Sequence, residues 1–430
     1  MSVYRSRRKR LASLMQSGVA VIRTASEQPR NRDTHFPFRH DSYFHYLSGF
    51  SEPEAVLVII AGKKPRSILF CRDKDVEREI WDGFRYGPEE AARLFGLDEA
   101  YSVKQLDEKL PELLGNQSVL YCHMGERPDW DAKLIGWLNT VRAQVRSGIA
   151  APANLHDVHQ LLDEMRLHKD GKEVATMRRA AQISAGAHCR AMRATRPGCF
   201  EYEIEAELLH EFRRHGSQAP AYTSIVAAGG NACVLHYVSN NAQMKDGDLL
   251  LIDAGCELDG YASDITRTFP VNGKFSGPQK AIYELVLAAQ SAAIAQVRPG
   301  KSFQAPHDAA VTVLVRGLVD LRLLKGSVEG LVESGDYRKF YMHRTSHWLG
   351  MDVHDCGDYK RGDKWRRLEA GMVLTVEPGC YIRPAADVAE RFWNIGVRIE
   401  DDALVTDTGR EILTRDVPKS VADIESLMRG

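Results

Sequence analysis

Apolar runs in the first part of the chain have the length and composition of buried strands. Residues 18–22 and 55–60 are rich in Val and Ile, and residues 67–71 form a third run of this kind. Helix-like patterns occupy the segments around 88–95 and 103–114. Because strands and helices alternate, we expect a mixed α/β region in which helices cover a sheet. None of these segments carries a cluster of residue types that bind metals.

A change in the pattern of apolar and polar residues between positions 154 and 172 indicates a domain boundary. A long helical pattern begins at residue 154 and is interrupted by the tripeptide Lys-Asp-Gly at 169–171. We therefore expect an α/β (α+β) protein with an N-terminal mixed α/β domain over 1–168 and a second domain over 169–430.

The second region repeats a short pattern. Two long helical segments end in the same tripeptide, Arg-Pro-Gly, at 196–198 and at 298–300, and a Phe and another amphipathic helix follow each time. Pro and Gly just beyond a helix are ordinary stop signals, so coincidence is one explanation. The other explanation is an internal duplication, with two helix–helix–strand halves related by a pseudo-two-fold axis. A site at the seam of two such halves would draw residues from both.

The composition is that of an ordinary globular chain and narrows the possible functions. Hydrophobic residues make up 44% of the sequence, and 57 basic residues face 58 acidic ones. A net charge near zero argues against binding to nucleic acid or to a membrane surface. No segment approaches the roughly 20 apolar residues that a membrane span needs. The eight cysteines are dispersed and form no C-x-x-C pair, which is typical of reduced thiols in a cytoplasmic protein.

The N-terminus carries a cluster of basic residues: Arg5, Arg7, Arg8, Lys9 and Arg10. A twin-arginine export signal is one interpretation of this cluster. However, polar residues and glycine at 16–18 interrupt the apolar stretch that follows, and the usual small-residue cleavage site is missing. We expect instead a solvated basic face on a helix that leads into the first strand.

Four carboxylates and one imidazole stand at the ends of strand-like segments in the second region: Asp253, Asp264, His347, Glu377 and Glu400. If the fold brings them together, they form an oxygen-rich site with room for two divalent cations. Such a site suits Mn²⁺ first and Zn²⁺ second. Two metals that share a water are a known solution to amide hydrolysis. We therefore predict a metal-dependent hydrolase.

Asp253 and Asp264 flank a predicted β-hairpin. They are eleven positions apart, an odd number, which places them on the same face of a hairpin with a two-residue turn. A turn at Leu258-Asp259 would make them directly opposite, whereas a turn at Asp259-Gly260 would make them diagonal neighbours. Two like charges on one face are unfavourable unless a cation lies between them. Solvated hairpin acids are the alternative, but the LLLI run before Asp253 favours burial.

Three histidines lie within a stretch of twelve residues: His343, His347 and His354. The spacing of the first two is that of the zinc-binding H-E-x-x-H helix, but Arg344 stands where the Glu base must be, and Gly350 weakens a helix. We reject that interpretation. A single His is more often structural than a ligand, yet beside four carboxylates we expect one of the three to bind metal.

Glu377 and Glu400 follow apolar segments, VLTV at 373–376 and the alternating IGVRI at 395–399. A carboxylate at the end of an apolar strand is costly to bury without a partner. Judged alone, Glu400 could equally be an ordinary acid on a sheet face. As a set, the strand-end acids and the clustered histidines indicate a metal centre.

With these motifs in place, the chain resembles the pita-bread metallopeptidases (peptidase family M24B), and within them the bacterial aminopeptidase P group. The resemblance extends over nearly the whole chain and includes FHYLSGFSEPEAVLVII, EMRLHKDGKEV, LIDAGCELDGYASDITRTFPVNGKF, SHWLGMDVHD, VLTVEPG and GVRIEDD. It implies a pita-bread catalytic domain with pseudo-two-fold symmetry after the N-terminal domain. It also implies hydrolysis of the N-terminal Xaa-Pro bond, with release of the first residue, through a metal-bridging hydroxide.

The resemblance assigns roles to individual residues. Asp253 would chelate one metal, Asp264 and Glu400 would bridge the two, and His347 and Glu377 would bind the other. Two divalent ions per subunit are implied, with Mn²⁺ first and Zn²⁺ or Co²⁺ as alternatives. The catalytic residues implied are Glu377 as the proton acceptor, with His354, His236 and Arg398. The substrate-binding residues implied are His343, Tyr381, Trp81 and Asp33.

The expected partners are peptides with proline at the second position. The resemblance also implies a homo-oligomer, a dimer or tetramer, in which Trp81 reaches a neighbouring subunit and the N-terminal domain controls substrate access. The segment CGDYKRGDKWRRLEAG departs from the bacterial pattern. The resemblance therefore does not assign the residues that contact the product side and the tail of the peptide. An Xaa-Pro dipeptidase (prolidase) is the first alternative, and an inactive peptide-binding module of the same fold is the second. The intact set of five ligands argues against the second.

Overall fold

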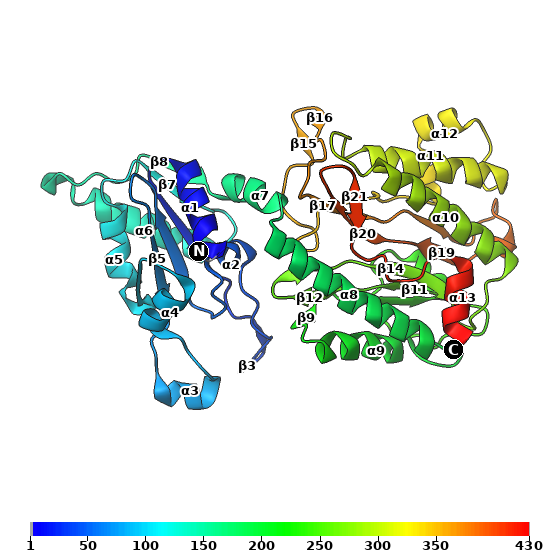
Figure 1. Cartoon of the computed structure of the whole chain (residues 1–430), viewed down its shortest axis with the longest axis horizontal. Coiled ribbons are helices and arrows are strands. Elements are labelled where there is room, and N and C mark those ends of the chain that lie inside the picture. Colours follow the sequence, from blue (N-terminus) through cyan, green and yellow to red (C-terminus); the bar gives the residue numbers. More distant parts are fainter. Residues whose placement is uncertain (1–2, 430) are drawn as a thin grey trace. The chain divides into compact units, whose positions relative to one another are not determined.

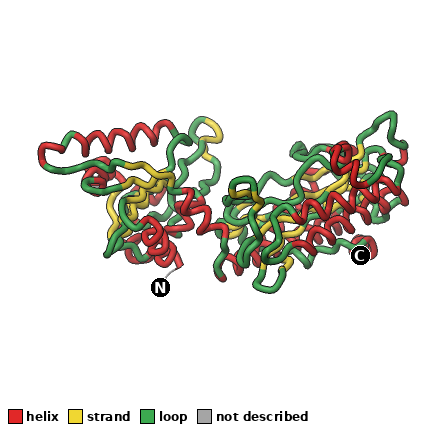
Figure 2. The backbone as a smooth tube through the Cα atoms, turned by 90° about the horizontal axis from the view of Figure 1, so that it is seen from above, coloured by secondary structure: helices red, strands yellow, loops and turns green. Residues whose placement is uncertain are grey.

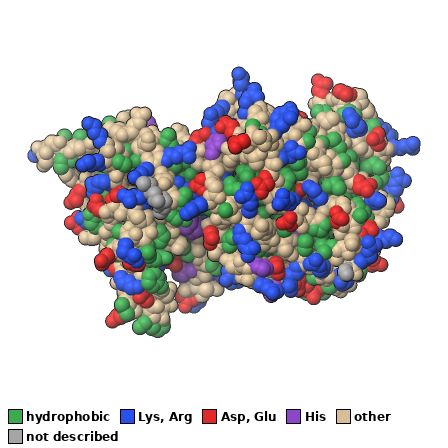
Figure 3. Space-filling view, viewed as in Figure 1, with side chains coloured by type: hydrophobic (Ala, Val, Ile, Leu, Met, Phe, Trp, Pro, Cys, Tyr) green, Lys and Arg blue, Asp and Glu red, His purple; other side chains and the backbone are tan. Residues whose placement is uncertain are grey.

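The computed structural model describes residues 3–429 and divides into two compact units, Met1–Met165 and Arg166–Gly430 (Figure 1). The sequence boundary was expected at 168/169, within the same stretch of chain. Each unit has its own hydrophobic core. None of the described helices is both long enough and apolar enough to cross a lipid bilayer. Basic and acidic side chains are interspersed over the face in Figure 3, as the balanced composition leads one to expect.

The first unit is built on a six-stranded mixed sheet with the order β6-β5-β4-β1-β7-β8. Its strands are β1 (Val19–Arg23), β4 (Val56–Ile60), β5 (Arg66–Cys71), β6 (Glu99–Ser102), β7 (Val119–Cys122) and β8 (Asn154–Asp157), and a short hairpin pairs β2 (Pro29–Asn31) with β3 (Thr34–His35). Its helices are α1 (Val3–Met15), α2 (Ser42–Ser48), α3 (Val76–Asp82), α4 (Gly87–Phe95), α5 (Leu106–Leu114), α6 (Pro128–Arg142) and α7 (His159–Leu167), which runs on past residue 165.

Alternate strand residues explain why this sheet is covered by helices. Val19 and Val21 of β1 share one core cluster with Val58 of β4, and α5 and α6 contribute Leu110 and Leu138 to it. Burial of these apolar side chains is the main driving force for the arrangement. The predicted mixed α/β region is confirmed, with strands and helices where the hydrophobic pattern placed them.

Two local expectations in this unit are wrong. Residues 154–157 begin the expected helix but form strand β8, because they pair in parallel with β7 at the edge of the sheet. Arg7 and Arg8, expected on a solvated helix face, are buried. Arg8 donates hydrogen bonds to the carbonyl oxygens of Leu47 (2.9 Å) and Phe95 (3.0 Å), so main-chain acceptors partner both of its terminal nitrogens.

The second unit contains two helix pairs and several small antiparallel sheets. Its helices are α8 (Gly171–Ala194), α9 (Glu201–Arg214), α10 (Gly277–Gln296), α11 (Ala305–Asp320), α12 (Val328–Ser334) and α13 (Val421–Arg429). Its longer strands are β10 (Ile225–Ala228), β11 (Leu249–Asp253), β12 (Cys256–Leu258), β14 (Thr266–Pro270), β17 (Val373–Val376), β18 (Gly379–Ile382), β19 (Ile395–Arg398), β20 (Asp401–Val405) and β21 (Arg410–Ile412). Two-residue strands complete the set: β9 (Ala219–Pro220), β13 (Tyr261–Ala262), β15 (Lys360–Arg361) and β16 (Lys364–Trp365).

The two helix pairs repeat one pattern. Each Arg-Pro-Gly tripeptide ends a long helix, α8 or α10, and each is followed by a second helix, α9 or α11. Each half also holds a three-stranded antiparallel sheet, β10-β11-β14 in the first and β17-β20-β21 in the second. In the view from above, the long helices run beside the strands (Figure 2). This repetition is what an internal duplication predicts.

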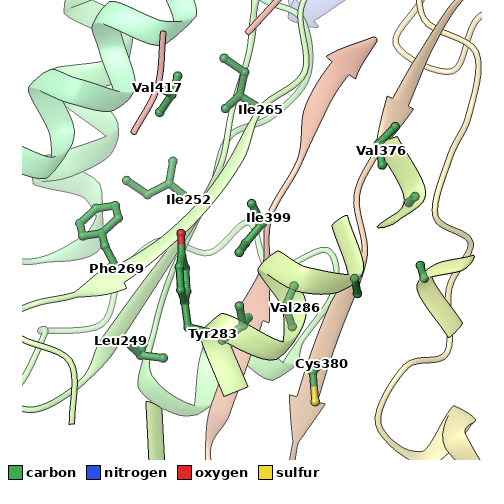
Figure 4. Close-up of a cluster of buried hydrophobic side chains, with 14 of the residues drawn as sticks. Leu249, Ile252, Ile265, Phe269, Tyr283, Val286, Val376, Cys380, Ile399 and Val417 are labelled. Atoms are coloured by element: carbon green, nitrogen blue, oxygen red, sulfur yellow. The ribbon is translucent and has the colours of Figure 1, made fainter. Parts of the chain in front are cut away.

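The core of the second unit joins its two halves. Tyr283 and Val286 of α10 lie near Ile252 of β11 and near Ile399, which follows β19 (Figure 4). All four side chains are fully buried. Because strands from both halves pack on the same helix, their ends meet at one place, and the candidate site is built there.

Candidate metal centre

The five predicted ligands come from the ends of strands in both halves of the second unit. Asp253 is the last residue of β11, Glu377 follows β17, and Glu400 lies between β19 and β20. Asp264 precedes β14, and His347 lies in an extended segment that follows the second helix pair. The segment around His347 contains no helix, so the rejection of a zinc-binding H-E-x-x-H helix is confirmed.

The register of the hairpin decides how Asp253 and Asp264 face each other. Asp253 pairs with Thr266 across β11 and β14, and the turn residues are Asp259 (φ 49°) and Gly260 (φ 78°). Positive φ at both central positions is typical of a type I′ hairpin turn. The second of the two predicted registers is therefore correct, and the two acids are diagonal neighbours.

Gly255 is required for this close approach. A Cβ atom at this position would lie 1.7 Å from the carbonyl oxygen of Ser263, the residue before Asp264. Any side chain at residue 255 would therefore push the two strand segments apart. This glycine lets the backbone that carries the two acids fold tightly.

Three ligand candidates are already clustered in the structure. Asp264, His347 and Glu400 each offer a ligand atom within 4.8 Å of those of the other two. The Nε2 atom of His347 lies 3.4 Å from Oδ2 of Asp264 and 3.7 Å from Oε1 of Glu377. The Nδ1 atom of His347 donates to the carbonyl oxygen of Trp348 (2.9 Å), so Nε2 is the ring atom that faces the carboxylates and that would bind a metal once it has lost its proton.

Asp253 is held by a chain of hydrogen bonds that includes three predicted site residues. Arg398 donates from Nη2 to Oδ2 of Asp253 (2.6 Å) and from Nη1 to the Tyr381 hydroxyl (2.9 Å). Tyr381 in turn donates to Nε2 of His343 (2.8 Å), because Nδ1 of that ring donates to the carbonyl of Arg344. Burial lowers the pKa of His343 to about 3, so the ring is neutral and can accept this bond.

Burial and crowding disfavour full ionisation of the carboxylates. Burial raises the pKa of Glu377 to about 7, and burial with the charge on Asp264 raises the pKa of Glu400 well above its usual range. Burial alone would lower the pKa of His347, but its contact with Asp264 and the charge on Glu377 outweigh burial and raise that pKa to about 9. Each shift reduces the excess negative charge of the cluster.

This arrangement fits divalent cations. Two buried carboxylates, Asp264 and Glu400, and two half-buried ones, Asp253 and Glu377, lie with the cations Arg398 and His347. Further positive charge would let all four carboxylates ionise. Oxygen ligands with a single imidazole suit Mn²⁺ and related ions rather than thiolate-seeking metals. The residues present therefore fit the predicted metal centre.

The remaining predicted residues lie in different places. His354 is exposed, and its ring lies 4.4 Å from the His347 ring in an edge-on arrangement. His236 is also exposed on the second unit. Trp81, in α3, and Asp33, between β2 and β3, are exposed residues of the first unit. Both residues belong to the first unit, whereas all five ligand candidates belong to the second.

Sequence analysis missed three residues that hold the ligands. The hydroxyl of Tyr222 lies 2.6 Å from Oδ1 of Asp253 and also contacts Oδ1 of Asp264. Thr266 donates to Oε2 of Glu400 (2.7 Å). Oδ2 of the fully buried Asp402 accepts a hydrogen bond from the Asp264 amide (3.1 Å).

Only Thr266 carried a usable signal. It lies two positions after Asp264, so strand periodicity places it on the same face. Asp402 lies two positions after Glu400, but its contact is with Asp264 in the other half, and Tyr222 reaches the centre from a segment without any ligand candidate.

Comparisons with known proteins match both units. The family model for metallopeptidase family M24 matches residues 175–407, and the model for the aminopeptidase P N-terminal domain matches residues 4–121. A protein of Haemophilus influenzae named Xaa-Pro aminopeptidase is 48% identical over 427 residues, 99% of this chain and 96% of its own length. The Escherichia coli protein of the same name is 46% identical, and the match covers 99% of this chain and 97% of its own length.

Solved structures agree with this. Aminopeptidase PepP of Pseudomonas aeruginosa superposes with a TM-score of 0.98 at 51% identity, over 99% of this chain and 97% of that one. A zinc-substituted aminopeptidase P of Escherichia coli in complex with product superposes with a TM-score of 0.97 at 46% identity. The match covers 100% of this chain and 98% of that one. The predicted resemblance is confirmed, and the chain belongs to metallopeptidase family M24, with an aminopeptidase P N-terminal domain ahead of its catalytic domain.

Proposed function

We propose that this protein is a metal-dependent Xaa-Pro aminopeptidase, which hydrolyses the bond before a proline in second position and releases the first residue. The observation that carries the proposal is the cluster of Asp264, His347 and Glu400 at the seam of the two halves. Glu377 lies 3.7 Å from His347, and Asp253 shares the Tyr222 hydroxyl with Asp264, so all five ligand candidates adjoin. Relatives of nearly equal length at 46% and 48% identity carry the name of this activity. An intact ligand set argues against a purely peptide-binding role.

Divalent metal binding follows from the family and from the donor set, and we propose two ions per subunit with Mn²⁺ as the native metal. When bound, the ions would make water a nucleophile near neutral pH and would polarise the scissile carbonyl. We assign Asp253 to one ion, His347 and Glu377 to the other, and Asp264 and Glu400 to both.

The protein residues would orient the substrate and move protons. Glu377 is buried beside His347, where a carboxylate can accept a proton and pass it to the leaving proline nitrogen. Arg398 holds the Asp253 carboxylate through its 2.6 Å contact, so that this acid can receive the free α-amine of the peptide. This requirement for a free amine would restrict the enzyme to N-terminal bonds.

Four further residues would contact the substrate. His354 and His236 are exposed, and the charge on His236 is among the causes that lower the pKa of His354, after its partial burial and the charge on His347. We propose that they stabilise negative charge that develops on the scissile carbonyl oxygen. His343 and Tyr381 form a fixed hydrogen-bonded pair that would line the peptide site.

Substrate length separates this proposal from its alternatives. Metal-stripped enzyme would be assayed with Ala-Pro and with Ala-Pro-Ala-Ala, with and without added Mn²⁺. We expect Mn²⁺-dependent release of alanine from the tetrapeptide. Cleavage of the dipeptide alone would identify a prolidase. Cleavage of neither, with metal shown to be bound, would identify a binding module.

We also propose a homo-oligomer that uses the N-terminal domain, residues 1–168, for assembly and substrate access. Helix α3 supports this idea, because none of its residues is buried and its side chains Val76, Ile80 and Trp81 are 71%, 78% and 83% exposed. Figure 1 shows α3 set apart from the rest of the first unit. Exposed apolar groups of this kind often mark protein contacts. We predict a dimer or tetramer in which Asp33 and Trp81 lie near the site of a neighbouring subunit. A cytoplasmic location also stays a prediction.

A further inference from the structure

Two histidines and an aspartate converge at one edge of the sheet in the first unit. Strands β1, β7 and β8 are parallel neighbours, so their carboxyl ends lie at the same edge. His123 follows the last residue of β7, Asp157 is the last residue of β8, and His159 is the first residue of α7. Cys122 and Asp157 are register partners, which brings His123 next to Asp157 although they are 34 positions apart.

The three side chains lie within the reach of one ion. Each offers a ligand atom within 4.8 Å of those of the other two. Nδ1 of His123 lies 3.4 Å from both carboxylate oxygens of Asp157, and the backbone N–H of His159 donates to Oδ1 of the same carboxylate (3.0 Å). These contacts hold the carboxylate beside the His123 ring and the first turn of α7.

Stacking orders the two imidazole rings. The His123 and His159 rings are stacked with centroids 3.9 Å apart, and Tyr43 stacks on the other ring face of His159, also at 3.9 Å. The hydroxyl of Tyr43 donates to Asp163 of α7 (2.6 Å), which fixes the end of this column. The stack keeps both imidazoles near Asp157, and an ion would have to part the two rings to bind a nitrogen of each.

A crevice opens beside these residues. It is lined by His123 and His159 together with Arg23 at the end of β1, and by Asp41, Glu126 and Trp130. In α/β folds, ligands commonly bind in a crevice at the carboxyl ends of parallel strands. The crevice gives an ion and its waters a route to the two histidines. Sequence analysis expected no such cluster in this region, since the sheet pairing alone brings these residues together.

We propose that His123, Asp157 and His159 form a second metal site, distinct from the catalytic centre, which binds a divalent transition ion such as Zn²⁺. Two imidazoles and one carboxylate suit Zn²⁺, Co²⁺ or Ni²⁺, whereas the carboxylate-rich centre suits Mn²⁺. Zn–N bonds of about 2.0–2.1 Å require the stacked rings to spread so that both nitrogens point at one ion. Waters from the crevice would complete the coordination. A bound ion would tie the ends of β7 and β8 to the start of α7.

Metal counting on full-length enzyme tests this site. Zn²⁺ bound per chain would be measured by equilibrium dialysis for the wild type and for the variants His123→Gln and His159→Gln. The matched control is His156→Gln. His156 lies in β8 directly before Asp157, and its exposed imidazole points to the opposite face of the sheet. Mn²⁺-dependent peptidase activity of every variant would show that the fold and the catalytic centre are intact.

We expect the wild type and His156→Gln to bind one more Zn²⁺ per chain than the other two variants. The remaining Zn²⁺ in those variants belongs to the catalytic centre, which all four proteins share. Crystals soaked in Zn²⁺ would show anomalous density between His123, Asp157 and His159. Equal Zn²⁺ stoichiometry in all four proteins, without density at this place, would overturn the proposal. If a histidine variant fails to fold, Asp157→Asn removes the third ligand and provides the same comparison.

Discussion

Arg267 and Asp401 form an ion pair that is completely shielded from solvent. The Nη2 atom of Arg267 lies 2.8 Å from Oδ1 of Asp401, and neither side chain is exposed. Lys419 reaches the other carboxylate oxygen (2.6 Å). Burial alone would raise the pKa of Asp401, but the charges on Arg267 and Lys419 outweigh it and hold the pKa below its usual value. Arg267 also donates to the backbone oxygen of Glu400, so it holds the main chain of a proposed metal ligand.

Replacing Arg267 with Met should lower the free energy of unfolding by about 3–5 kcal/mol, because it leaves a buried carboxylate without its main partner. The same change should weaken metal binding, since the backbone of Glu400 loses a donor. Urea unfolding with and without Mn²⁺ measures both effects. The control is Arg410→Met on an exposed strand position, which should change stability by less than about 0.5 kcal/mol. Similar losses in the two variants would mean that the buried pair contributes little.

Replacing Glu377 with Ala should reduce kcat by at least about 100-fold, since it removes a metal ligand and the proposed proton acceptor together. Steady-state hydrolysis of Ala-Pro-Ala-Ala at saturating Mn²⁺ is the measurement. Glu333→Ala, at an exposed position of α12, is the control and should keep wild-type activity. A Glu377 variant that keeps most of its kcat would show that the proton acceptor lies elsewhere.

Stabilisation by metal should grow as the pH rises. Burial raises the pKa of Glu377 from 4.5 to about 7, so in the metal-free protein this group favours the folded state fully below pH 4.5. That contribution is lost as the pH rises through 7. A bound cation displaces the protons and compensates for this loss, so metal affinity increases over the same range.

Scanning calorimetry of metal-free and Mn²⁺-loaded enzyme between pH 5.5 and 8 tests this expectation through the difference in Tm. Glu377→Gln cannot ionise at this position, so the pH dependence should become shallower in that variant. A difference in Tm that stays constant with pH would contradict the proposed coupling between protons and metal.

Replacing Trp81 with Ala should impair assembly or the hydrolysis of longer peptides and leave the metal content unchanged. The side chain is 83% exposed on the first unit, so its loss removes a contact surface without opening the core. Sedimentation velocity, peptide-length profiles and metal analysis are the three readouts. Val145→Ala, at an exposed apolar position of the same unit, is the control. Metal loss in the Trp81 variant would mean that the first unit supports the centre in another way.

Local patterns determined much of this protein from the sequence alone. Continuous apolar runs located strands β1, β4 and β5, because these strands bury side chains on both faces of the sheet and such runs are recognisable in the sequence. The Asp-Gly pair at the tip of the hairpin limited Asp253 and Asp264 to one face. Strand-end acids also marked the ligand set, because a carboxylate after an apolar run is costly to bury without a partner.

Only the tertiary structure decided which distant groups meet. Tyr222 reaches Asp253 from a segment with no metal-binding signature, Asp402 contacts Asp264 across 138 positions of sequence, and His123 meets Asp157 through pairing of β7 with β8. The burial of Arg8 likewise depends on carbonyl groups far along the chain. Such contacts depend on how whole elements pack, and packing energy is shared among many residues, so no short stretch of sequence records it.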